Sequence, residues 1–259
     1  MVKRAIVCLV LALLVLSVSL LARTQTPQTA RGVIRLKVKY KSGATTKELP
    51  RKRFFLIKGS LEQNSALVEK IKQAEAPSRE CYYRKQGASE QLIKWLDDHD
   101  CESVYCREIE DRYISGSEAV PEFKTAYDQA LRDLKTPEVA RRWLPNYLVP
   151  EIRDGYYQAR QQASDGLVKL AEASTGKPAM SIMTDRKGTA YLTDIDPGIY
   201  TISNLVGSET DKHSILWICE REVKATDLWL AMKRPFTLSN EKDPKVKCEV
   251  IERPLPVCK

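Results

Sequence analysis

Residues 184–205, TDRKGTAYLTDIDPGIYTISNL, constrain the fold more than any other stretch of this chain. The segment DRKG at residues 185–188 is typical of a tight turn, because its glycine reaches positive φ without steric cost. The segment DPG at residues 196–198 predicts a second turn. Before and after this second turn, apolar residues alternate with polar ones, as they do on half-buried strands. The stretch therefore predicts two consecutive strands of an antiparallel sheet, joined by a short turn.

The same stretch resembles a known sequence pattern. It reads T-D-x-x-G-x-A-x-L-x-D-I-x-P-G-x-Y-T-I, which is similar to the core repeat of carboxypeptidase regulatory-like domains and to the related B-type repeats of collagen adhesins. The matching residues are Thr184, Asp185, Gly188, Ala190, Leu192, Pro197, Gly198, Tyr200 and Ile202. The resemblance covers residues 31–59 and 176–235, and it implies a transthyretin-like β-sandwich of the kind found in secreted and surface proteins. It implies an architecture and no particular reaction, because one fold hosts many functions.

Strand-like spacing also occurs near both ends of the chain. Residues 33–40 alternate between apolar and mostly basic side chains, which predicts a half-buried strand. Residues 53–58 form a short apolar run that predicts a second strand. Further strands are predicted over residues 215–223, 228–232 and 245–251, after a polar loop at residues 206–214.

Residues 60–175 show helical spacing instead. Ser89 is a typical N-cap residue and predicts the start of one helix, and a longer helix is predicted over residues 150–173. The apolar side chains expected to face inward on the helices include Leu67, Val68, Ile71, Phe123, Val139, Trp143, Tyr156 and Leu170.

These patterns together predict an α+β protein, with a transthyretin-like antiparallel β-sandwich interrupted by a mainly helical insertion. Residues 23–59 and 176–259 would form the discontinuous β-sandwich domain. Residues 60–175 would form the helical insertion, which is long enough to enclose a small core of its own.

The N-terminal residues have the pattern of a targeting segment. Lys3 and Arg4 precede an uncharged run from Ala5 to Ala22, which predicts a secretory signal peptide over residues 1–22. The run is close in length to a membrane span, so a retained N-terminal anchor is the alternative. We therefore expect an exported protein that is periplasmic, on the cell surface or extracellular. It would contact a membrane only if this segment is retained as an anchor.

The chain is mildly basic, but the sequence does not predict a nucleic-acid partner. There are 42 Lys and Arg residues and 34 Asp and Glu residues, which gives a formal net charge of +8. Both signs are intermixed along the chain, as on a solvated surface. The sequence contains no nucleic-acid-binding motif, and an exported protein would not meet nucleic acid in its compartment.

Six cysteines remain when Cys8 is removed with the signal peptide. An even number of cysteines in an exported chain predicts disulfides, and fifteen complete pairings are possible. The candidates are Cys81, Cys101, Cys106, Cys219, Cys248 and Cys258. We favour a bond between Cys219 and Cys248 on C-terminal strands, with Cys258 tied back to the middle of the chain.

Four residues offer the strongest alternative chemistry. Cys81, His99, Cys101 and Cys106 could hold zinc, because thiolate and imidazole ligands suit a tetrahedral zinc site. Their spacing is not that of a standard pair of zinc knuckles, and an oxidising compartment favours disulfides over thiolates. We therefore expect no metal site and no cofactor.

The other polar candidates are interpreted as structural. His99 follows two aspartates at a helix end, where an imidazole interacts favourably with the helix dipole. His213 lies in the predicted polar loop, in a solvated turn, and Asp194 and Asp196 flank a Pro-Gly turn as ordinary turn residues. No nucleophile elbow, zinc-protease helix or phosphate-binding glycine loop occurs in the sequence, so no catalytic residue is predicted.

Aromatic residues of the helical segment allow two interpretations. They could line a groove for a glycan or a peptide, or one member of each tyrosine pair could pack in a helical core. The residues are Tyr82, Tyr83, Trp95, Trp143, Tyr156 and Tyr157. We favour the core interpretation, because Tyr156 already falls on an apolar helical stripe.

The sequence leaves two functional hypotheses. The first is a non-enzymatic binding or structural module of the cell envelope or secretome, in which the β-sandwich is a scaffold and the helical insertion is the interaction surface. Its partner would be a protein or an envelope polymer. The alternative is a metal-dependent or hydrolytic enzyme with its site at the junction of the insertion and the sandwich.

Overall fold

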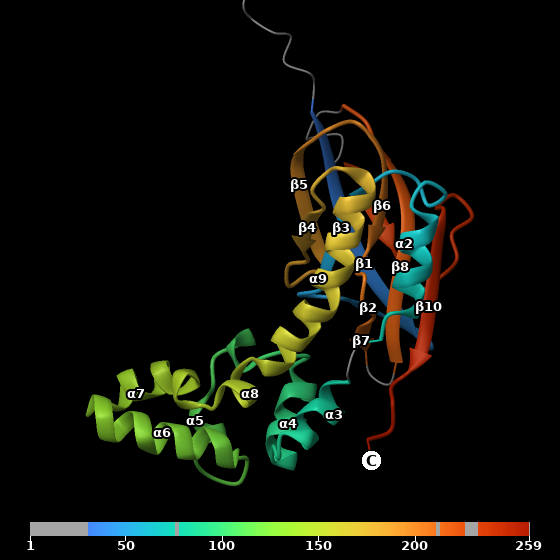
Figure 1. Cartoon of the computed structure of the whole chain (residues 1–259). Coiled ribbons are helices and arrows are strands. Elements are labelled where there is room, and N and C mark those ends of the chain that lie inside the picture. The colour runs from blue at the N-terminus through green and yellow to red at the C-terminus, as the bar shows by residue number, and fades with distance from the viewer. Residues whose placement is uncertain (1–30, 76–77, 211–212, 226–232, 259) are drawn as a thin grey trace, which may run out of the picture.

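The computed structural model describes residues 31–75, 78–210, 213–225 and 233–258. The predicted signal peptide and the strand predicted at residues 228–232 lie outside the described residues. The chain is an α+β protein, with strands near both ends of the sequence and helices between them (Figure 1). The strands are β1 (Gly32–Ser42), β2 (Thr45–Glu48), β3 (Arg53–Lys58), β4 (Met180–Met183), β5 (Thr189–Ile195), β6 (Gly198–Ser203), β7 (Ser208–Thr210), β8 (His213–Val223), β9 (Phe236–Leu238) and β10 (Cys248–Pro254). The helices are α2 (Ser65–Gln73), α3 (Arg79–Lys85), α4 (Glu90–Asp98), α5 (Asp111–Ile114), α6 (Pro121–Leu134), α7 (Pro137–Trp143), α8 (Pro150–Arg153) and α9 (Gly155–Thr175), with 3-10 turns η1 (Val104–Cys106) and η2 (Leu144–Tyr147).

The first sheet is built around β1. The alternation in its sequence places Ile34, Leu36 and Val38 on the buried face, while the basic residues between them are only half-buried. β1 pairs antiparallel with β2 and β5 and parallel with β9. Its register with β5 sets Leu36 opposite Ala190, so apolar side chains of both strands face the same core.

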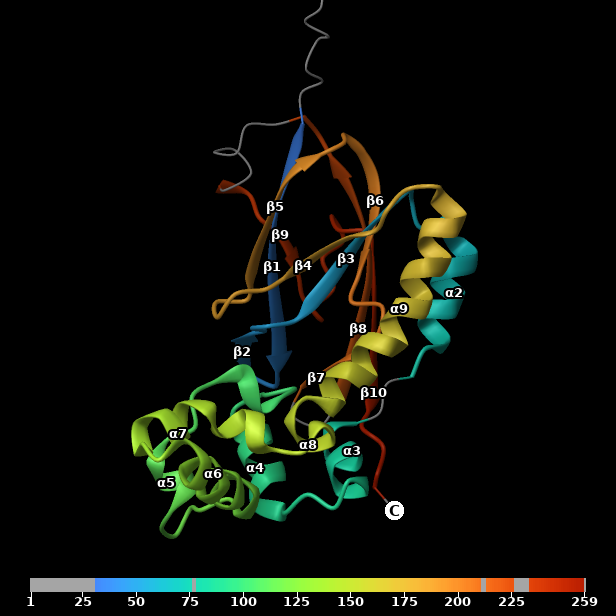
Figure 2. The ribbon, with the colours of Figure 1, turned by 60° about the vertical axis from the view of Figure 1, so that its left-hand side comes forward.

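The second sheet runs in the order β10-β8-β6-β3-β4, with β7 paired to β8. β8 lies inside this sheet and is apolar on both faces, as expected for a strand that is covered twice. Trp217 and Cys219 pack with residues of the first sheet, whereas Leu216 and Ile218 pack with α2 and α9. The sheet is therefore covered on one face by the first sheet and on the other by two helices (Figure 2).

The helices α3 to α8 enclose a separate hydrophobic cluster with the start of α9. Leu92, Trp95, Phe123 and Leu144 are its centre and are at most 2 % exposed. Ser89 caps α4, because its hydroxyl accepts a hydrogen bond from the Leu92 backbone nitrogen at 3.1 Å. These helices lie at one end of the sheets, and α9 runs from them along the outer face of the second sheet (Figures 1 and 2). Among the described residues, no helix is both long enough and apolar enough to cross a membrane.

The turn before β5 depends on two residues. The carboxylate of Asp185 accepts hydrogen bonds from the backbone nitrogens of Thr189 and Lys187, and these bonds lower the pKa of Asp185. Gly188 has a φ of +63°, and a Cβ atom at this position would lie 2.7 Å from the carbonyl oxygen of Val38. The turn therefore needs glycine for its conformation and for its close approach to β1.

The turn between β5 and β6 is closed by side chains. The Tyr200 hydroxyl donates to the carbonyl oxygen of Asp196 at 2.7 Å. The Lys58 ammonium donates to the carbonyl oxygen of Pro197 at 2.8 Å and lies 4.6 Å from the centre of the Tyr200 ring. These contacts hold the start of β6 against the end of β3.

The polar loop predicted over residues 206–214 is not found in its described part, residues 206–210 and 213–214. Val206 and Ser208 are each 2 % exposed, and β7 pairs with the start of β8. The Asn204 side chain explains this arrangement, since its amide donates to Ser208 Oγ and its Oδ1 accepts from the Trp217 backbone nitrogen. The polar groups of this segment satisfy one another in a buried turn, which composition alone does not reveal.

The helix predicted over residues 150–173 is two helices in the structure. The helix is interrupted at Asp154, which separates α8 from α9. The start of α9 packs in the helical cluster, and its later turns pack on the second sheet, where Ala171 is buried and Leu170 is 42 % exposed. The prediction that Leu170 faces inward is therefore wrong.

The prediction for α7 is correct in part. The helix begins at Pro137 after Thr136, and Leu144, which was expected to face inward, is buried. Val139 and Trp143 were also expected to face inward, but they are 40 % and 52 % exposed. α7, which packs against α6, buries the small side chain of Ala140 instead. The short elements α3, α5, β2 and β4 were not predicted.

Candidate functional site

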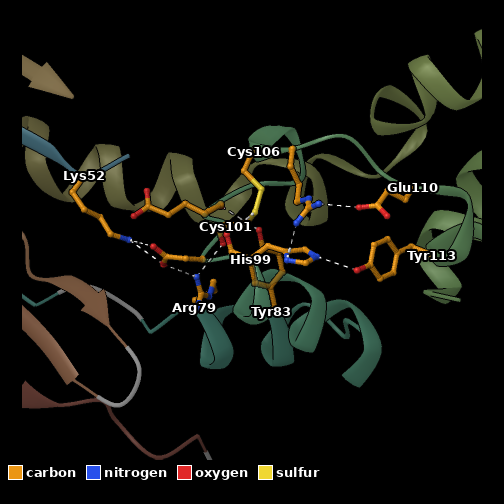
Figure 3. The surroundings of a disulfide bond; sticks show 11 residues. Lys52, Arg79, Tyr83, His99, Cys101, Cys106, Glu110 and Tyr113 are labelled. Atoms are coloured by element: carbon orange, nitrogen blue, oxygen red, sulfur yellow. Dashed lines mark hydrogen bonds and ion pairs between the residues drawn. A yellow bond between two sulfur atoms is a disulfide. The ribbon is translucent and has the colours of Figure 1, made fainter. Parts of the chain in front are cut away.

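Charged side chains meet where the helices join the two sheets. They come from the turn before β3, from α3, from the end of α4 and the segment after it, from α9 and from β7. Figure 3 shows Lys52 and Arg79 reaching toward this junction from the strand side and the helix side. We call the group the junction cluster, and its members are Lys52, Arg79, Asp97, Asp100, Glu102, Arg160 and Glu209.

Arg79 is the centre of the junction cluster and is 8 % exposed. Its guanidinium donates to the carbonyl oxygen of Cys101 at 3.2 Å and to the Asp97 carboxylate at 2.5 Å. It also lies 3.5 Å from the Asp100 carboxylate. Burial by itself lowers the pKa of Arg79, but the carboxylates of Glu209, Asp100 and Asp97 together raise it. Arg79 therefore stays charged in the folded protein.

Glu209 is a half-buried acid of the junction cluster. Its Oε1 accepts a hydrogen bond from the Arg79 backbone nitrogen at 2.7 Å. Burial raises the pKa of Glu209, and the charges of Arg79 and Arg160 offset only part of that rise. Such carboxylates occur in active sites and in structural ion-pair networks. The two cations that face Glu209 belong to this chain, which is the arrangement of a structural network.

Lys52 and Arg160 extend the junction cluster to the sheets. The Lys52 side chain is 3 % exposed, and its ammonium lies 2.9 Å from the Asp100 carboxylate. Arg160 donates to the carbonyl oxygen of Gly207 at 2.9 Å and lies 3.3 Å from Glu102. These contacts connect the turn before β3, the segment after α4, and α9 in one network of charges.

A cleft of about 550 Å³ opens beside the junction cluster, between the helices and the first sheet. Acidic side chains predominate over basic ones in its lining. The acids are Glu48, Glu80, Glu90, Asp97, Asp98, Asp100 and Glu209, and the bases are Lys47, Arg79 and Lys94. Most of these acids already form ion pairs within the chain, such as Glu48 with Lys37 and Asp98 with Lys94, both at 2.8 Å. A ligand of this cleft would have to compete with these internal pairs.

His99 lies at the end of α4 in an aromatic setting (Figure 3). Its Nδ1 is 3.0 Å from the Arg107 guanidinium and its Nε2 is 3.2 Å from the Tyr113 hydroxyl, while its ring meets Trp95 edge-on. Burial, and then the charge of Arg107, lower the pKa of His99. The guanidinium can only donate, so Nδ1 accepts and the Nε2 hydrogen points to Tyr113. The imidazole is neutral at pH 7, and both of its nitrogens are engaged.

The structure joins six cysteines in three disulfides, with Cα separations of 5.0 Å for Cys81–Cys258, 5.6 Å for Cys101–Cys106 and 3.9 Å for Cys219–Cys248. The first bond ties the end of the chain to α3, the second closes the segment beside the junction cluster (Figure 3), and the third joins β8 to β10. The four residues of the zinc hypothesis are not assembled as ligands in this state, because their cysteines are oxidised and Cys81 is paired with Cys258. Among the residues that the structure describes, no group of His, Cys, Asp and Glu is placed to hold a metal ion.

The remaining candidates are dispersed. Asp194 and Asp196 both form ion pairs with Arg31 near the turn between β5 and β6. His213 is not in a solvated turn, because it is the first residue of β8 and lies opposite Pro254 of β10. The tyrosine pairs follow the core interpretation, since one member of each pair is buried, namely Tyr83 and Tyr156. Trp95 is buried with them, whereas Trp143 is exposed.

The sequence analysis did not identify Arg79, Arg160 or Glu209. Arg79 follows Ser78, which caps α3 by accepting a hydrogen bond from the Cys81 backbone nitrogen, and that cap could have located the helix. No sequence spacing relates Arg79 to Glu209, since 130 positions separate them. Only the fold brings these residues together.

Comparison with known proteins adds little to this picture. No protein-family model matches the chain, and no curated protein matches it. Among solved structures, the pilus backbone RrgB from Streptococcus pneumoniae is 12% identical, with a TM-score of 0.24, over 81% of this chain and 41% of that chain. The full-length structure of the same pilus protein is 11% identical, with a TM-score of 0.22, over 75% of this chain and 25% of that chain. The chain thus spans less than half the length of either pilus structure, and scores this low do not indicate a shared fold.

Proposed function

We propose that this chain is an exported, non-enzymatic binding or structural module of the cell envelope or secretome. The observation that carries the proposal is the set of three disulfides, one of which joins residues 177 positions apart. Disulfides of this kind persist in oxidising compartments such as the periplasm, the cell surface and the extracellular space. The predicted signal peptide over residues 1–22 points to the same compartments.

The architecture that fits this role is a scaffold with an inserted interaction region. Residues 23–59 and 176–259 would form a discontinuous, transthyretin-like β-sandwich of the carboxypeptidase regulatory-like kind. A core shared by the two sheets supports this division. Residues 60–175 would form the helical insertion, and the separate hydrophobic cluster of α3 to α8 supports that assignment.

The helical insertion is the better candidate for the interaction surface. It carries five large apolar side chains that are at least 40 % exposed. One of them, Leu170, lies on α9, and we call the other four the helical patch: Tyr105, Val139, Trp143 and Val149. The Tyr105 hydroxyl donates to Asn146 Oδ1 at 2.7 Å, which places Tyr105 beside η2 and the residues that flank it. Exposed aromatic side chains of this kind are enriched at protein interfaces. The partner would be a protein or an envelope polymer.

The enzyme alternative would need a free base, nucleophile or metal ligand at the junction. The acids and bases of the junction cluster instead pair with one another, and His99 is engaged through both nitrogens. This arrangement favours a structural role for the junction, which would hold the helical patch in a fixed position relative to the sheets.

The proposal is tested by site-specific photocrosslinking of the full chain, expressed with its own N-terminus in its source cells. A photoreactive benzoylphenylalanine replaces Trp143 in the helical patch, and in a matched control it replaces Tyr191 on β5, which has a similar exposure of 46 %. We expect a crosslinked product of discrete mass from position 143 and none from position 191. Products at both positions, or at neither, would contradict an interaction surface on the helices.

A further inference from the structure

A second pocket lies away from the helical patch, between α9 and the outer face of the second sheet. The register of β3 with β4 sets Arg53 opposite Met183 and Phe55 opposite Ser181, so these four side chains share one face. All four line the pocket, whose volume is about 230 Å³. α9 crosses above this face, and its residues Tyr157, Ser164 and Val168 form the opposite wall.

One end of the pocket is fixed by a hydrogen bond across it. The Arg53 guanidinium on β3 donates to the Tyr157 hydroxyl on α9 at 2.9 Å. Phe55 is 7 % exposed and Val206 is 2 % exposed, and both also belong to the hydrophobic cluster under α9. The pocket therefore has an apolar base and a guanidinium held at its wall.

The charges of the pocket are not balanced. Its cationic residues are Arg51, Lys52, Arg53 and Arg160, and its acids are Glu102 and Asp165. Lys52 is neutralised by Asp100, and Arg160 is neutralised by Glu102. Arg51 forms no ion pair with any described residue, and Arg53 donates to the neutral hydroxyl of Tyr157. The lining thus holds two guanidinium groups without a paired acid and one exposed acid, Asp165.

The backbone at Arg51 holds an uncommon conformation. Arg51 has a φ of +55°, which a residue with a Cβ atom adopts at a cost of roughly 1–2 kcal/mol. The conformation is held by the hydrogen bond from its backbone nitrogen to the Thr184 carbonyl oxygen at 3.0 Å. Thr184 is itself fixed, because its hydroxyl donates to the Leu49 carbonyl oxygen at 2.8 Å. This constrained turn places Arg51 at the pocket.

We propose that this pocket binds a carboxylate group attached to a short apolar body. The planar guanidinium groups of Arg51 and Arg53 match the two oxygens of a carboxylate, and the apolar base formed by Phe55 and Val206, with Val168 on the opposite wall, receives the body. A volume of about 230 Å³ admits a group the size of one leucine residue and excludes most larger metabolites. The same chemistry is offered by a free small acid and by the C-terminus of a peptide.

The test is a titration of the full oxidised protein, followed by two-dimensional NMR. The probes are N-acetyl-leucine, which carries the carboxylate, and N-acetyl-leucinamide, which has the same body without the charge. We expect saturable shifts at β3, β4 and α9 with the acid, at least tenfold weaker binding of the amide, and weaker binding of the acid at high salt. Equal binding of the acid and the amide would overturn the proposal.

Variants separate the pocket from general electrostatic attraction. Arg51→Gln should weaken binding of N-acetyl-leucine at least tenfold, whereas Arg142→Gln, which removes an exposed charge from α7, should not change it. Val168→Phe fills the pocket while keeping both arginines, and it should also abolish binding. Retained binding in Arg51→Gln or in Val168→Phe, with a native spectrum, would overturn the proposal.

A second pair of probes identifies the source of the carboxylate. The peptide Ala-Ala-Ala-Leu is compared with its C-terminally amidated form and with N-acetyl-leucine. Binding of the free peptide at least tenfold tighter than that of N-acetyl-leucine assigns the pocket to a chain terminus, and equal binding assigns it to a small acid. Either result supports the carboxylate site. The amidated peptide binding as well as the free peptide would contradict it.

Discussion

Replacing Arg79 tests the claim that the junction cluster holds the helices on the sheets. The substitution Arg79→Met keeps most of the apolar stem and removes the guanidinium, which is buried among Glu209, Asp100 and the Cys101 carbonyl oxygen. The ion-pair partners of the guanidinium, Asp97 and Asp100, are 67 % and 38 % exposed, and Glu209 acts on it through its charge. Leaving a buried polar group without its partner typically costs about 1–3 kcal/mol.

The expected cost lies in the middle of that range. Glu209 keeps the hydrogen bond from the backbone nitrogen of residue 79 and retains the charge of Arg160 nearby. Asp97 is exposed, so losing its contact with Arg79 matters little. We therefore expect Arg79→Met to lower the free energy of unfolding by about 2 kcal/mol. Arg84→Met provides a matched control, because Arg84 lies on the same helix and pairs only with exposed acids, and we expect no measurable loss.

The destabilisation caused by Arg79→Met should depend on pH in one direction. The pKa of Glu209 is raised on folding, so its contribution to stability is present below its unfolded pKa and is lost as the pH rises through its folded pKa. Without the Arg79 guanidinium this pKa rises further, and the loss caused by Arg79→Met should be greater at pH 8 than at pH 5. Urea unfolding followed by far-UV circular dichroism measures both quantities.

Two results would refute this reasoning. One is a loss below about 1 kcal/mol at pH 8, which would mean that the guanidinium does not compensate a buried charge. The other is an equal loss in Arg79→Met and in the double variant Arg79→Met/Glu209→Gln. We expect the double variant to recover part of the stability, because it removes the buried charge that Arg79→Met leaves unpaired.

Three further predictions concern single features of the fold. Gly188→Ala should lower the free energy of unfolding in urea by at least about 1–2 kcal/mol, because residue 188 has a φ of +63° and a Cβ atom there would contact the Val38 carbonyl oxygen. An unchanged unfolding midpoint would contradict this prediction. The pKa of His99 is lowered on folding, so the free energy of unfolding should fall as the pH drops from 6.5 through the folded pKa. The substitution His99→Gln should flatten this pH dependence, and an unchanged pH profile in the variant would refute the prediction. Replacing Cys81 and Cys258 by serine should lower the free energy of unfolding by about 2–5 kcal/mol, whereas wild-type stability in this variant would show that the bond contributes nothing.

The strands near the N-terminus could be predicted because their signal is local. The alternation of residues 33–40 lies within β1, and the run at residues 53–58 is β3. Ser89 likewise predicts the start of α4, because its hydroxyl acts on a backbone nitrogen three residues away. In each case the physical cause lies within a few residues of the pattern.

The buried faces of the later helices could not be predicted in this way. Nothing in the spacing of residues 150–173 requires the break at Asp154. Nor does it show that α9 packs on other helices at Tyr156 and on the second sheet at Ala171, which leaves Leu170 exposed. On α7 the contact with α6 selects the small side chain of Ala140 over the larger ones beside it. These outcomes depend on tertiary packing, which overrides a local apolar stripe.

The junction cluster could not be predicted from the sequence. Lys52 contacts Asp100, and Arg79 contacts Glu209, across 48 and 130 positions of the chain. Charged residues are common along this chain, so no single one marks the junction. The cysteines were a stronger signal, because an even number in a chain with a predicted signal peptide indicates disulfides before any contact is known.

The most direct test of the account is the intact mass of the full chain recovered from its native compartment, with and without reductant and thiol alkylation. We expect a chain without residues 1–22 whose native mass is lower than the reduced mass by six hydrogens, and whose thiols do not react until they are reduced. Peptide mapping should then find Cys81 bonded to Cys258. Free thiols in the protein as recovered, or a chain that stays in a reducing compartment, would contradict an exported, disulfide-bonded module.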